Sequence, residues 1–266
     1  MIRYFLAIPA VSVFFLAPFT SFQAQEFPPH VSTASVTAPA RTTLSDEDQA
    51  RLYLIKKQYR EAQDLFHRLT MEHPKNAVYW NELGITFHNQ VELSAALKCY
   101  EKSAKLDSHY ADAVNNMGTI WYERKKYPKA IRAYKRAIAI RNDFSPFFMN
   151  LGYAYFGKKE YDDSIASFRK ALELDPDAFD VSKSRAGTII QDRSIRTDRG
   201  LFYFLLAKSF ASAGNIDRCV IYLRKARDEG YADINSAKSD PSFAKVIADP
   251  AIQEALAPKP LETPQP

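Results

Sequence analysis

The side chains best suited to catalysis or metal binding are scattered through this sequence and form no known motif. The two cysteines lie far apart in the chain, and no C-x-x-C pair occurs. Neither the nucleophile motif G-x-S-x-G nor the phosphate-binding motif G-x-x-x-x-G-K-[ST] is present. The five histidines, none at the H-x-x-x-H spacing of zinc ligands on one helix face, are His30, His67, His73, His88 and His109. We therefore expect no catalytic residue, no metal site and no cofactor.

The composition indicates which elements carry these side chains. Of the 266 residues, 46% are hydrophobic and only 8 are glycine. That is enough apolar material for a core, and the long helix-forming stretches favour an all-helical body. The formal charge of +5 comes from 36 basic and 31 acidic residues, far from the concentrated basic stripe that nucleic acid requires. We expect no nucleic-acid partner.

A 34-residue repeat organises the middle of the chain, where Gly84, Gly118 and Gly152 follow one another at intervals of 34. A large apolar residue precedes each glycine, and an aromatic residue follows three positions later. A small residue stands twelve positions after the glycine, with another aromatic four positions further on. In chain order these residues are Leu83, Phe87, Ala96 and Tyr100; Met117, Trp121, Ala130 and Tyr134; and Leu151, Tyr155, Ser164 and Phe168.

This pattern resembles the tetratricopeptide repeat (TPR), whose consensus runs W-x2-L-G-x2-Y, then A-x3-F, then P. The resemblance is closest in residues 145–178. It implies an all-α fold, a right-handed TPR superhelical solenoid of about five helix-turn-helix repeats with a C-terminal helical cap. The expected repeats, of which the first and last are divergent as end units often are, are 43–76, 77–110, 111–144, 145–178 and 200–233.

The small residues of the pattern are expected to let helix backbones approach, with the aromatic residues filling the space beside them. Close approach matters because each helix pair buries its apolar face only by stacking on the next pair. Polar residues mark the helix starts. Ser45 precedes three acidic residues, and Asn76 precedes the helix that carries Trp80. Ser145 is predicted to supply a capping hydroxyl ahead of Pro146 at the first helical position.

The N-terminal residues 1–24 are expected to be a secretory signal peptide. A single charge at Arg3 precedes an apolar run that ends at Phe19, and a cleavage site is predicted after Ala24. The competing interpretation is an uncleaved anchor, although the run of about 16 apolar residues is shorter than the roughly 20 that span a bilayer. The Pro-, Ser- and Thr-rich residues 25–44 are expected to form a flexible linker. The protein would then be exported, periplasmic or secreted, or else anchored to the membrane by its N terminus.

Three segments after the fourth repeat depart from the repeat pattern. Residues 179–199 are a 21-residue insert, interpreted either as a poorly ordered loop or as a functional lip on one face. Two Asp-Pro pairs within residues 234–257 each place a capping acid before a proline. They predict two short helices, SFAKVIA and AIQEALA, that cap the last repeat. The proline-rich residues 258–266 are expected to be a disordered tail.

The repeat frame places Cys99 and Cys219 on second helices of the second and fifth repeats. Stacked helices are roughly 8–10 Å apart, so the two cysteines are expected to be tens of ångströms apart. A disulfide requires Cα atoms within about 7 Å. We therefore expect two reduced, largely buried thiols.

The TPR resemblance implies that the inner face of the first helices holds a protein or peptide ligand. Asn can donate to and accept from an extended backbone, while Tyr and Phe offer rigid apolar area. The alternative is that these aromatics belong to the core. One TPR subgroup clamps a ligand's terminal carboxylates with Lys and Arg, and this chain has no cation in the matching stretch, so such a ligand is not expected. The family's groove positions correspond to Asn81, Ile85, His88, Asn115, Thr119, Tyr122, Met149, Tyr153 and Phe156.

Basic residues recur in the turns that join the two helices of a repeat. Equivalent turns of a solenoid stack along one edge, so these residues are expected to form a basic edge that attracts phosphates or acidic protein. The alternative is a set of solvated turns that keep the repeat array soluble. The residues of this basic edge are Lys56, Lys57, Arg124, Lys125, Lys126, Lys158 and Lys159.

These observations predict a non-catalytic scaffold or adaptor that binds a peptide or partner protein in its concave groove. The alternative is an envelope module that associates peripherally with a membrane and binds anionic lipid or polysaccharide through the basic edge. A third hypothesis, a cryptic hydrolase or enzyme accessory, would require a cleft with a perturbed acid–base pair.

Overall fold

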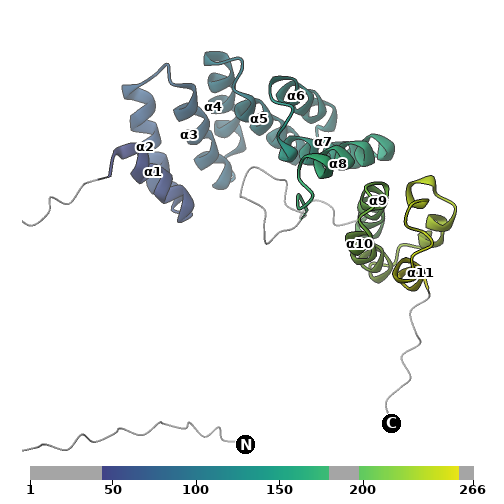
Figure 1. Cartoon of the computed structure of the whole chain (residues 1–266). Helices are drawn as coiled ribbons and strands as arrows, with labels where there is room; N and C mark the ends of the chain where they lie inside the picture. Colours follow the sequence, from purple (N-terminus) through teal and green to yellow (C-terminus); the bar gives the residue numbers. More distant parts are fainter. Residues whose placement is uncertain (1–43, 180–197, 258–266) are drawn as a thin grey trace, which may run out of the picture. The chain divides into compact units, whose positions relative to one another are not determined.

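The computed structural model of the chain describes residues 44–179 and 198–257 (Figure 1). Every regular element within these ranges is helical. The α-helices are α1 (Asp46–Ile55), α2 (Tyr59–Glu72), α3 (Ala77–Asn89), α4 (Leu93–Leu106), α5 (Ala111–Glu123), α6 (Tyr127–Ile140), α7 (Ser145–Lys158), α8 (Tyr161–Leu174), α9 (Arg199–Ser212), α10 (Ile216–Asp228) and α11 (Pro250–Leu256). None of these helices is long and apolar enough to cross a membrane.

The first ten α-helices pack as five consecutive pairs, α1 with α2 through to α9 with α10. The second helix of each of the first four pairs also packs on the first helix of the next pair. The pairs follow one another in chain order (Figure 1). One cluster of buried residues extends from Tyr122 to Leu256, so the last three pairs share a continuous core. This arrangement of helix pairs confirms the predicted all-α repeat fold.

The glycine of each repeat makes room for an aromatic ring of the same repeat. A Cβ atom at Gly84 would lie 2.5 Å from the Tyr100 ring, closer than real Cβ contacts come. The same overlap occurs between Gly118 and Tyr134 at 2.5 Å and between Gly152 and Phe168 at 2.3 Å. All three rings are fully buried. The rings fill the space beside the glycines, as predicted for small residues that let the helices of a repeat approach.

Of the three helix caps predicted within the repeats, two are present. The Ser45 side chain accepts a hydrogen bond from the Asp48 amide, and the Asn76 side chain accepts from the Val78 and Tyr79 amides. The predicted cap at Ser145 is wrong, because α7 already begins at this residue. Its hydroxyl is buried and donates to the Ala171 carbonyl of α8 at 2.9 Å. The hydroxyl therefore bonds to α8 and does not cap the start of α7.

The two ends of the 21-residue insert belong to the helical stack. The Phe179 ring lies 5.3 Å from Phe168 and 6.0 Å from Phe210, which links the fourth and fifth helix pairs. Arg199 is the first residue of α9 and pairs with Glu229 at 3.0 Å. The rest of the insert, residues 180–197, lies outside the described residues, as do residues 1–43 and 258–266, which include the predicted signal peptide, most of the linker and the tail.

The last pair is covered by short helices. The 3-10 segments Ile234–Lys238 and Pro241–Phe243 are followed by α11. The predicted Asp-Pro starts are present, since the side chains of Asp240 and Asp249 accept from the Ser242 and Ala251 amides. The segment SFAKVIA is not one helix, because only the 3-10 turn Pro241–Phe243 precedes a run of turns.

Both cysteines are free and buried, on α4 and α10. Burial raises the pKa of Cys99 to about 11 and that of Cys219 to about 12. Each thiol is therefore protonated near neutral pH and packs as a small apolar side chain.

Candidate functional site

A chain of asparagine side chains connects the first helices α3, α5 and α7. The Asn116 amide donates to Asn81 Oδ1 at 2.9 Å, and the Asn150 amide donates to Asn115 Oδ1 at 3.0 Å. The Asn115 amide donates in turn to Asn116 Oδ1 at 3.3 Å. Each link between neighbouring pairs joins residues 35 positions apart, one more than the repeat length. All four side chains are buried.

This chain changes the role of two predicted groove residues. Asn81 and Asn115 are each only 2% exposed, and their amide groups serve neighbouring helices. Asn81 also donates to the Tyr110 hydroxyl at 3.4 Å. Neither amide is open to a ligand backbone, because the next first helix in the stack covers it.

The predicted groove residues of α7 are also buried. Met149, Tyr153 and Phe156 are 3%, 6% and 7% exposed. The Tyr153 ring stacks on Phe202 of α9 at 5.4 Å, and the Phe156 ring meets Phe202 edge to face at 5.2 Å. These aromatics belong to the core, the alternative that the sequence had left open, because α9 packs over them despite the insert.

The groove positions of α5 are closed in the same way. The Thr119 hydroxyl donates to the Asn115 carbonyl and accepts from the Tyr134 hydroxyl, both at 3.3 Å. The Tyr122 ring lies edge to face with Tyr127 of α6 at 5.6 Å. Both side chains are 4% exposed.

The two predicted groove residues that remain partly exposed, Ile85 and His88, lie on α3. His88 Nε2 lies 2.8 Å from Glu123 Oε1 of α5, and 14% of the His88 side chain is exposed. Its Nδ1 lies 3.4 Å from the Tyr100 hydroxyl. Ile85 is half-buried, so α3 offers an apolar and a polar group on neighbouring helical turns.

Glu82 is a further residue of this face, which the sequence reasoning missed. It stands one repeat length before Asn116, the asparagine that donates to Asn81 of the preceding helix pair. Glu82 thus occupies the same repeat position as that donor. Glu47, on α1, stands one repeat length before Asn81, so the first junction of the stack has two carboxylates where the next has two amides. This shared register was visible in the sequence and would have identified the site.

The two carboxylates differ in their contacts. Glu47 accepts from the Tyr79 hydroxyl at 2.7 Å and pairs with Arg51 at 3.0 Å. Glu82 is half-buried and has no hydrogen bond or ion pair with another described residue. Burial raises the pKa of Glu82 above its ordinary value of 4.5, and the charge of Arg51 opposes that shift.

The turns within the repeats share one backbone feature. Each places a residue with positive φ at the same register position, namely Lys57, Val91, Lys125 and Lys159, with φ from 56° to 67°. Gly214 takes this place in the last pair. The lysines at these positions are exposed. Among the described residues no ion pair joins Lys57, Lys125 or Lys159 to a carboxylate, so their ammonium groups face solvent.

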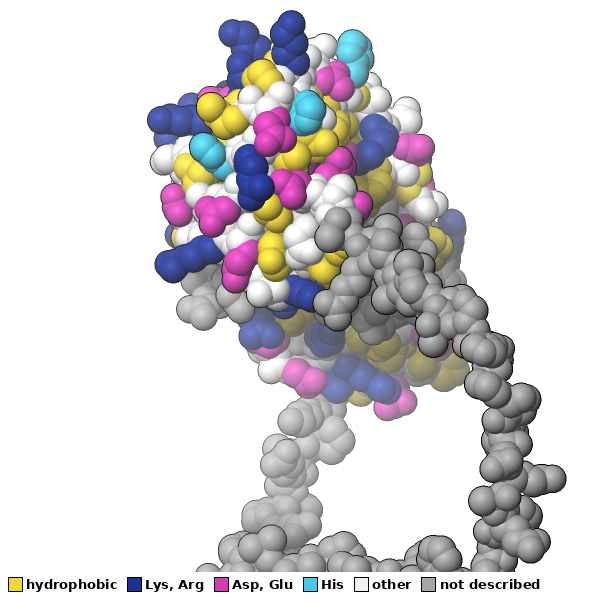
Figure 2. Space-filling model, turned by 90° about the vertical axis from the view of Figure 1, so that its left-hand side faces the viewer, with side chains coloured by type: hydrophobic (Ala, Val, Ile, Leu, Met, Phe, Trp, Pro, Cys, Tyr) yellow, Lys and Arg dark blue, Asp and Glu magenta, His cyan; other side chains and the backbone are white. Residues whose placement is uncertain are grey.

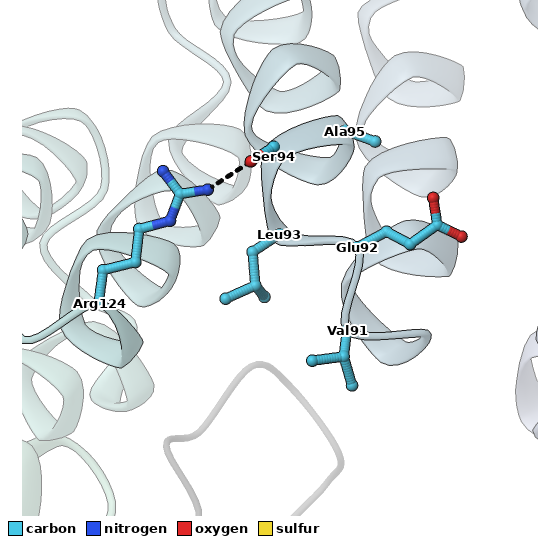
Figure 3. Close-up of a pocket in the computed structure, with 6 residues that line it drawn as sticks. All are labelled: Val91, Glu92, Leu93, Ser94, Ala95 and Arg124. Atoms are coloured by element: carbon cyan, nitrogen blue, oxygen red, sulfur yellow. Dashed lines mark hydrogen bonds between the residues drawn. The ribbon is translucent and has the colours of Figure 1, made fainter.

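A shallow, open depression lies between the second and third of these turns, lined by Val91, Glu92, Leu93, Ser94, Ala95 and Arg124. Arg124 reaches across it and donates to the Ser94 hydroxyl at 2.9 Å, while Glu92 points away (Figure 3). The depression has no nucleophile and base side by side, and in the part of the chain that the structure describes no group of three His, Cys, Asp or Glu side chains is placed to hold a metal ion.

Figure 2 shows the face of the molecule at the α1–α2 side. Outside the grey atoms, hydrophobic side chains on this face are separated by basic, acidic and histidine side chains. A mixed outer face of this kind is typical of the terminal unit of a repeat stack, which has a neighbour on one side only.

Comparison with known proteins identifies the repeat. The tetratricopeptide-repeat model matches residues 145–178, and a second TPR repeat model matches residues 118–159. No curated protein sequence matches the chain.

Several solved structures resemble the fold at low sequence identity. MamA from Desulfovibrio magneticus RS-1 is 16% identical, with 71% of this chain and 95% of that chain covered and a TM-score of 0.49. TTC0263, a thermophilic TPR protein in Thermus thermophilus, is 17% identical, with 73% and 97% covered and a TM-score of 0.48. The first TPR of Spaghetti (RPAP3), bound to an HSP90 peptide, is 22% identical, with 39% and 82% covered and a TM-score of 0.38.

The two matched repeat models lie within the run of helix pairs in which the glycine, the buried aromatic ring and the turn recur once in each repeat. The chain therefore contains tetratricopeptide repeats.

Proposed function

We propose that this protein is a non-catalytic scaffold that binds a peptide or partner protein across the first-helix face of its second repeat. The observation that supports this location is the difference in exposure along that face. Glu82, Ile85 and His88 of α3 are half-buried, whereas the equivalent side chains of α5 and α7 are buried. These three residues follow one another at three-residue spacing, so they lie on neighbouring turns of one helix side.

The side chains of this α3 face indicate the kind of ligand. Ile85 offers apolar area, and Glu82 offers a carboxylate that is half-buried without a described partner. A ligand ammonium or guanidinium group would make a charge-assisted hydrogen bond there, and such bonds are roughly twice as strong as neutral ones. We therefore propose a ligand segment with a basic side chain beside an aliphatic or aromatic one. A ligand held by its terminal carboxylate would be repelled.

A random peptide library displayed against the purified protein tests this proposal. Peptides that pair Lys or Arg with an apolar residue should be enriched. Ile85→Asp should weaken their binding about tenfold or more, as a charge placed in an apolar contact does, and Glu82→Gln should remove the preference for Lys and Arg. Met71→Asp is the matched control, because Met71 is 69% exposed on α2 and should have no effect.

The library result contradicts the proposal if Ile85→Asp and Met71→Asp bind the selected peptides equally well. Circular dichroism and the melting temperature of each variant show whether the fold is retained. Enrichment of peptides without a basic residue would contradict the assigned role of Glu82 while leaving the α3 face as the binding site.

We further propose that the protein acts after export, with residues 1–24 as the signal. The support is the sequence pattern of one early charge followed by an apolar run. Fractionation of the native cells combined with N-terminal sequencing tests this. A mature N terminus near residue 25 in a soluble exported fraction is expected, whereas an intact N terminus in the membrane fraction would favour the anchor.

A second candidate function is supported by the turns within the repeats. Three observations agree for Lys57, Lys125 and Lys159: a shared register position, an exposed side chain, and a positive φ in the turn. We propose that this basic edge binds an anionic surface, either lipid or polysaccharide. Reversing these charges should abolish binding to both kinds of anion, a test that is developed below.

A further inference from the structure

We infer that the basic edge docks on an anionic lipid bilayer, with Ile55 and Val91 as apolar contacts between the lysines. This inference rests on the second candidate function and decides between its two proposed ligands. We define the turn edge as residues 55–58, 89–92, 124–126 and 158–159, which are the turns within the first four repeats together with the last helical residue before the first, second and fourth turns.

The two most exposed large hydrophobic side chains of the described residues lie on the turn edge. Ile55 is 78% exposed and Val91 is 77% exposed, more than any other large hydrophobic side chain in the described ranges. Ile55 is the last residue of α1, and Val91 lies in the turn that follows α3 in the next repeat. A bilayer offers hydrocarbon to such side chains, and a polysaccharide does not, so this exposure favours lipid.

The backbone at Val91 adds an independent observation. Its φ of 66° places a β-branched residue in the left-handed region, which is a genuine outlier for this residue type. The other turns have Lys or Gly at this position. Strain of this kind persists only where the surroundings impose it, and it is often found at functional sites. The turn therefore holds an apolar side chain outward although glycine would fit it better.

Side-chain contacts hold successive turns of the edge next to one another. The Gln90 amide of the second turn donates to Gln63 of α2 at 2.6 Å. Arg124 of the third turn donates to Ser94, two residues beyond the second turn. A Cβ atom on Gly157, which precedes the fourth turn, would lie 2.5 Å from the Tyr127 ring next to the third turn. The apolar and basic side chains can therefore meet one surface together.

The charge of the turn edge complements an anionic surface. Lys56, Lys57, Lys125, Lys126 and Lys159 are exposed, and none of them forms an ion pair with a described carboxylate. Lys158 is also exposed and pairs with Glu160 at 2.5 Å. Glu92, in the second turn, is the negative residue nearest to Val91 in the chain. A surface of acidic lipids attracts basic side chains of the protein over about a Debye length. Apolar side chains can then stabilise the protein at the surface once it is in contact.

Vesicle sedimentation with the full chain tests the inference. Vesicles of phosphatidylglycerol and phosphatidylcholine should bind the protein, and vesicles of phosphatidylcholine alone should not. The double variant Ile55→Ser/Val91→Asn removes both apolar side chains, and Asn tolerates the left-handed conformation. It should bind anionic vesicles about tenfold more weakly, as expected when two partly inserted aliphatic groups are lost, while its binding to dextran sulfate stays unchanged.

Two matched controls accompany this variant. Met71→Ser/Ile221→Ser removes two exposed hydrophobic side chains away from the turn edge and should bind as the parent does. Charge reversal of Lys56, Lys57, Lys125 and Lys159 to Glu should abolish binding to both vesicles and dextran sulfate. The same reversal at four exposed lysines elsewhere, Lys75, Lys98, Lys105 and Lys245, should have a smaller effect.

The outcomes separate the inference from the function on which it rests. If charge reversal on the turn edge abolishes binding but Ile55→Ser/Val91→Asn binds vesicles like the parent, the basic edge is purely electrostatic and the lipid inference is overturned. If both sets of charge reversals act equally, or if anionic vesicles and dextran sulfate do not bind the parent, the second candidate function fails as well. Melting temperatures confirm that each variant is folded.

Discussion

The junctions between repeats two, three and four differ in chemistry from the junction between repeats four and five. In the former, buried asparagines form hydrogen bonds from one first helix to the next, with donor and acceptor 35 residues apart. In the latter, the insert interrupts the spacing and the contact is a cluster of rings around Phe202, which meets Tyr153, Phe156 and Phe168 at 5.4, 5.2 and 5.9 Å.

The difference shows two ways to stack the same unit. Amide hydrogen bonds require donor and acceptor at fixed distance and angle, so they suit junctions in which the repeat length is constant. Aromatic rings are held by area and shape and tolerate several relative orientations. The ring cluster includes a stacked pair, Tyr153 with Phe202 at 20°, and an edge-to-face pair, Phe156 with Phe202 at 78°. An aromatic junction can therefore follow an insert that would disrupt a hydrogen-bonded register.

The largest expected effect is at the aromatic junction. Phe202→Ala removes a 2% exposed ring from the centre of the cluster and should destabilise the protein by about 3–5 kcal/mol, the usual range for a buried Phe. Urea unfolding followed by tryptophan fluorescence and circular dichroism measures it. Since both tryptophans lie in repeats two and three, loss of ellipticity before the fluorescence change would show that the last pair has separated. Coincident transitions with no loss of stability would contradict the proposed role of the ring.

The next effect is at the polar junction. Asn116→Leu removes the donor to Asn81 and the acceptor of Asn115, which leaves two buried amides short of a partner at a cost of about 2 kcal/mol. Asn89→Leu is the control, because Asn89 is exposed and its loss should cost less than about 0.5 kcal/mol. Equal values for the two variants in urea unfolding would show that the asparagine chain contributes no stability.

A conservative change at the aromatic junction sharpens the comparison. Phe202→Leu retains an apolar side chain and should cost only about 1 kcal/mol, because cores tolerate apolar swaps of similar size. The same new residue, leucine, should thus cost less at position 202 than at position 116. The free energies of unfolding of the two leucine variants test this order directly, and the reverse order would remove the distinction between the junctions.

The smallest effect concerns the first junction, where Glu82 and Glu47 replace the two amides. Glu82→Gln should stabilise the protein by roughly 0.5 kcal/mol at pH 7, because a half-buried carboxylate without a described partner is removed. Burial raises the pKa of Glu82, so its charged form is the one disfavoured by folding. The gain should therefore be present above that raised pKa and vanish below the ordinary value of 4.5.

Melting temperatures of the parent and of Glu82→Gln between pH 3.5 and 8 measure this dependence. A gain that persists unchanged below about pH 4 would mean that the effect does not come from ionisation of Glu82.

The repeat frame could be predicted from the sequence, because its causes are local and periodic. Gly84 and Tyr100 lie on the two helices of one repeat, and their spacing recurs wherever a ring must fit beside a glycine. Caps such as Ser45 and Asn76 depend on backbone amides two or three positions further along the chain. Both kinds of signal can be read without knowing which helix packs on which. The fold class and the repeats could therefore be predicted from the sequence.

The sequence could not predict in the same way which individual side chains lie in the core and which lie on the surface. Ser145 has the sequence context of a helix cap, yet the end of α8 takes its hydroxyl. Tyr153 and Phe156 have the register of a ligand groove, yet Phe202 covers them after an insert whose length gave no indication of where α9 would pack. Glu82 occupies the repeat position at which the next repeats have an asparagine, and only its neighbours in the fold make it half-buried.

The sequence by itself determined the repeat period, the helix pairs and the basic residues of the turns, since these depend on residue type and spacing within a single unit. Only the tertiary structure decided which first-helix residues remain accessible, because burial depends on the next unit in the stack. Contact with the next unit buries Asn81, Asn115 and Tyr153. It leaves Glu82, Ile85 and His88 partly open on α3, and Ile55 and Val91 exposed on the turn edge.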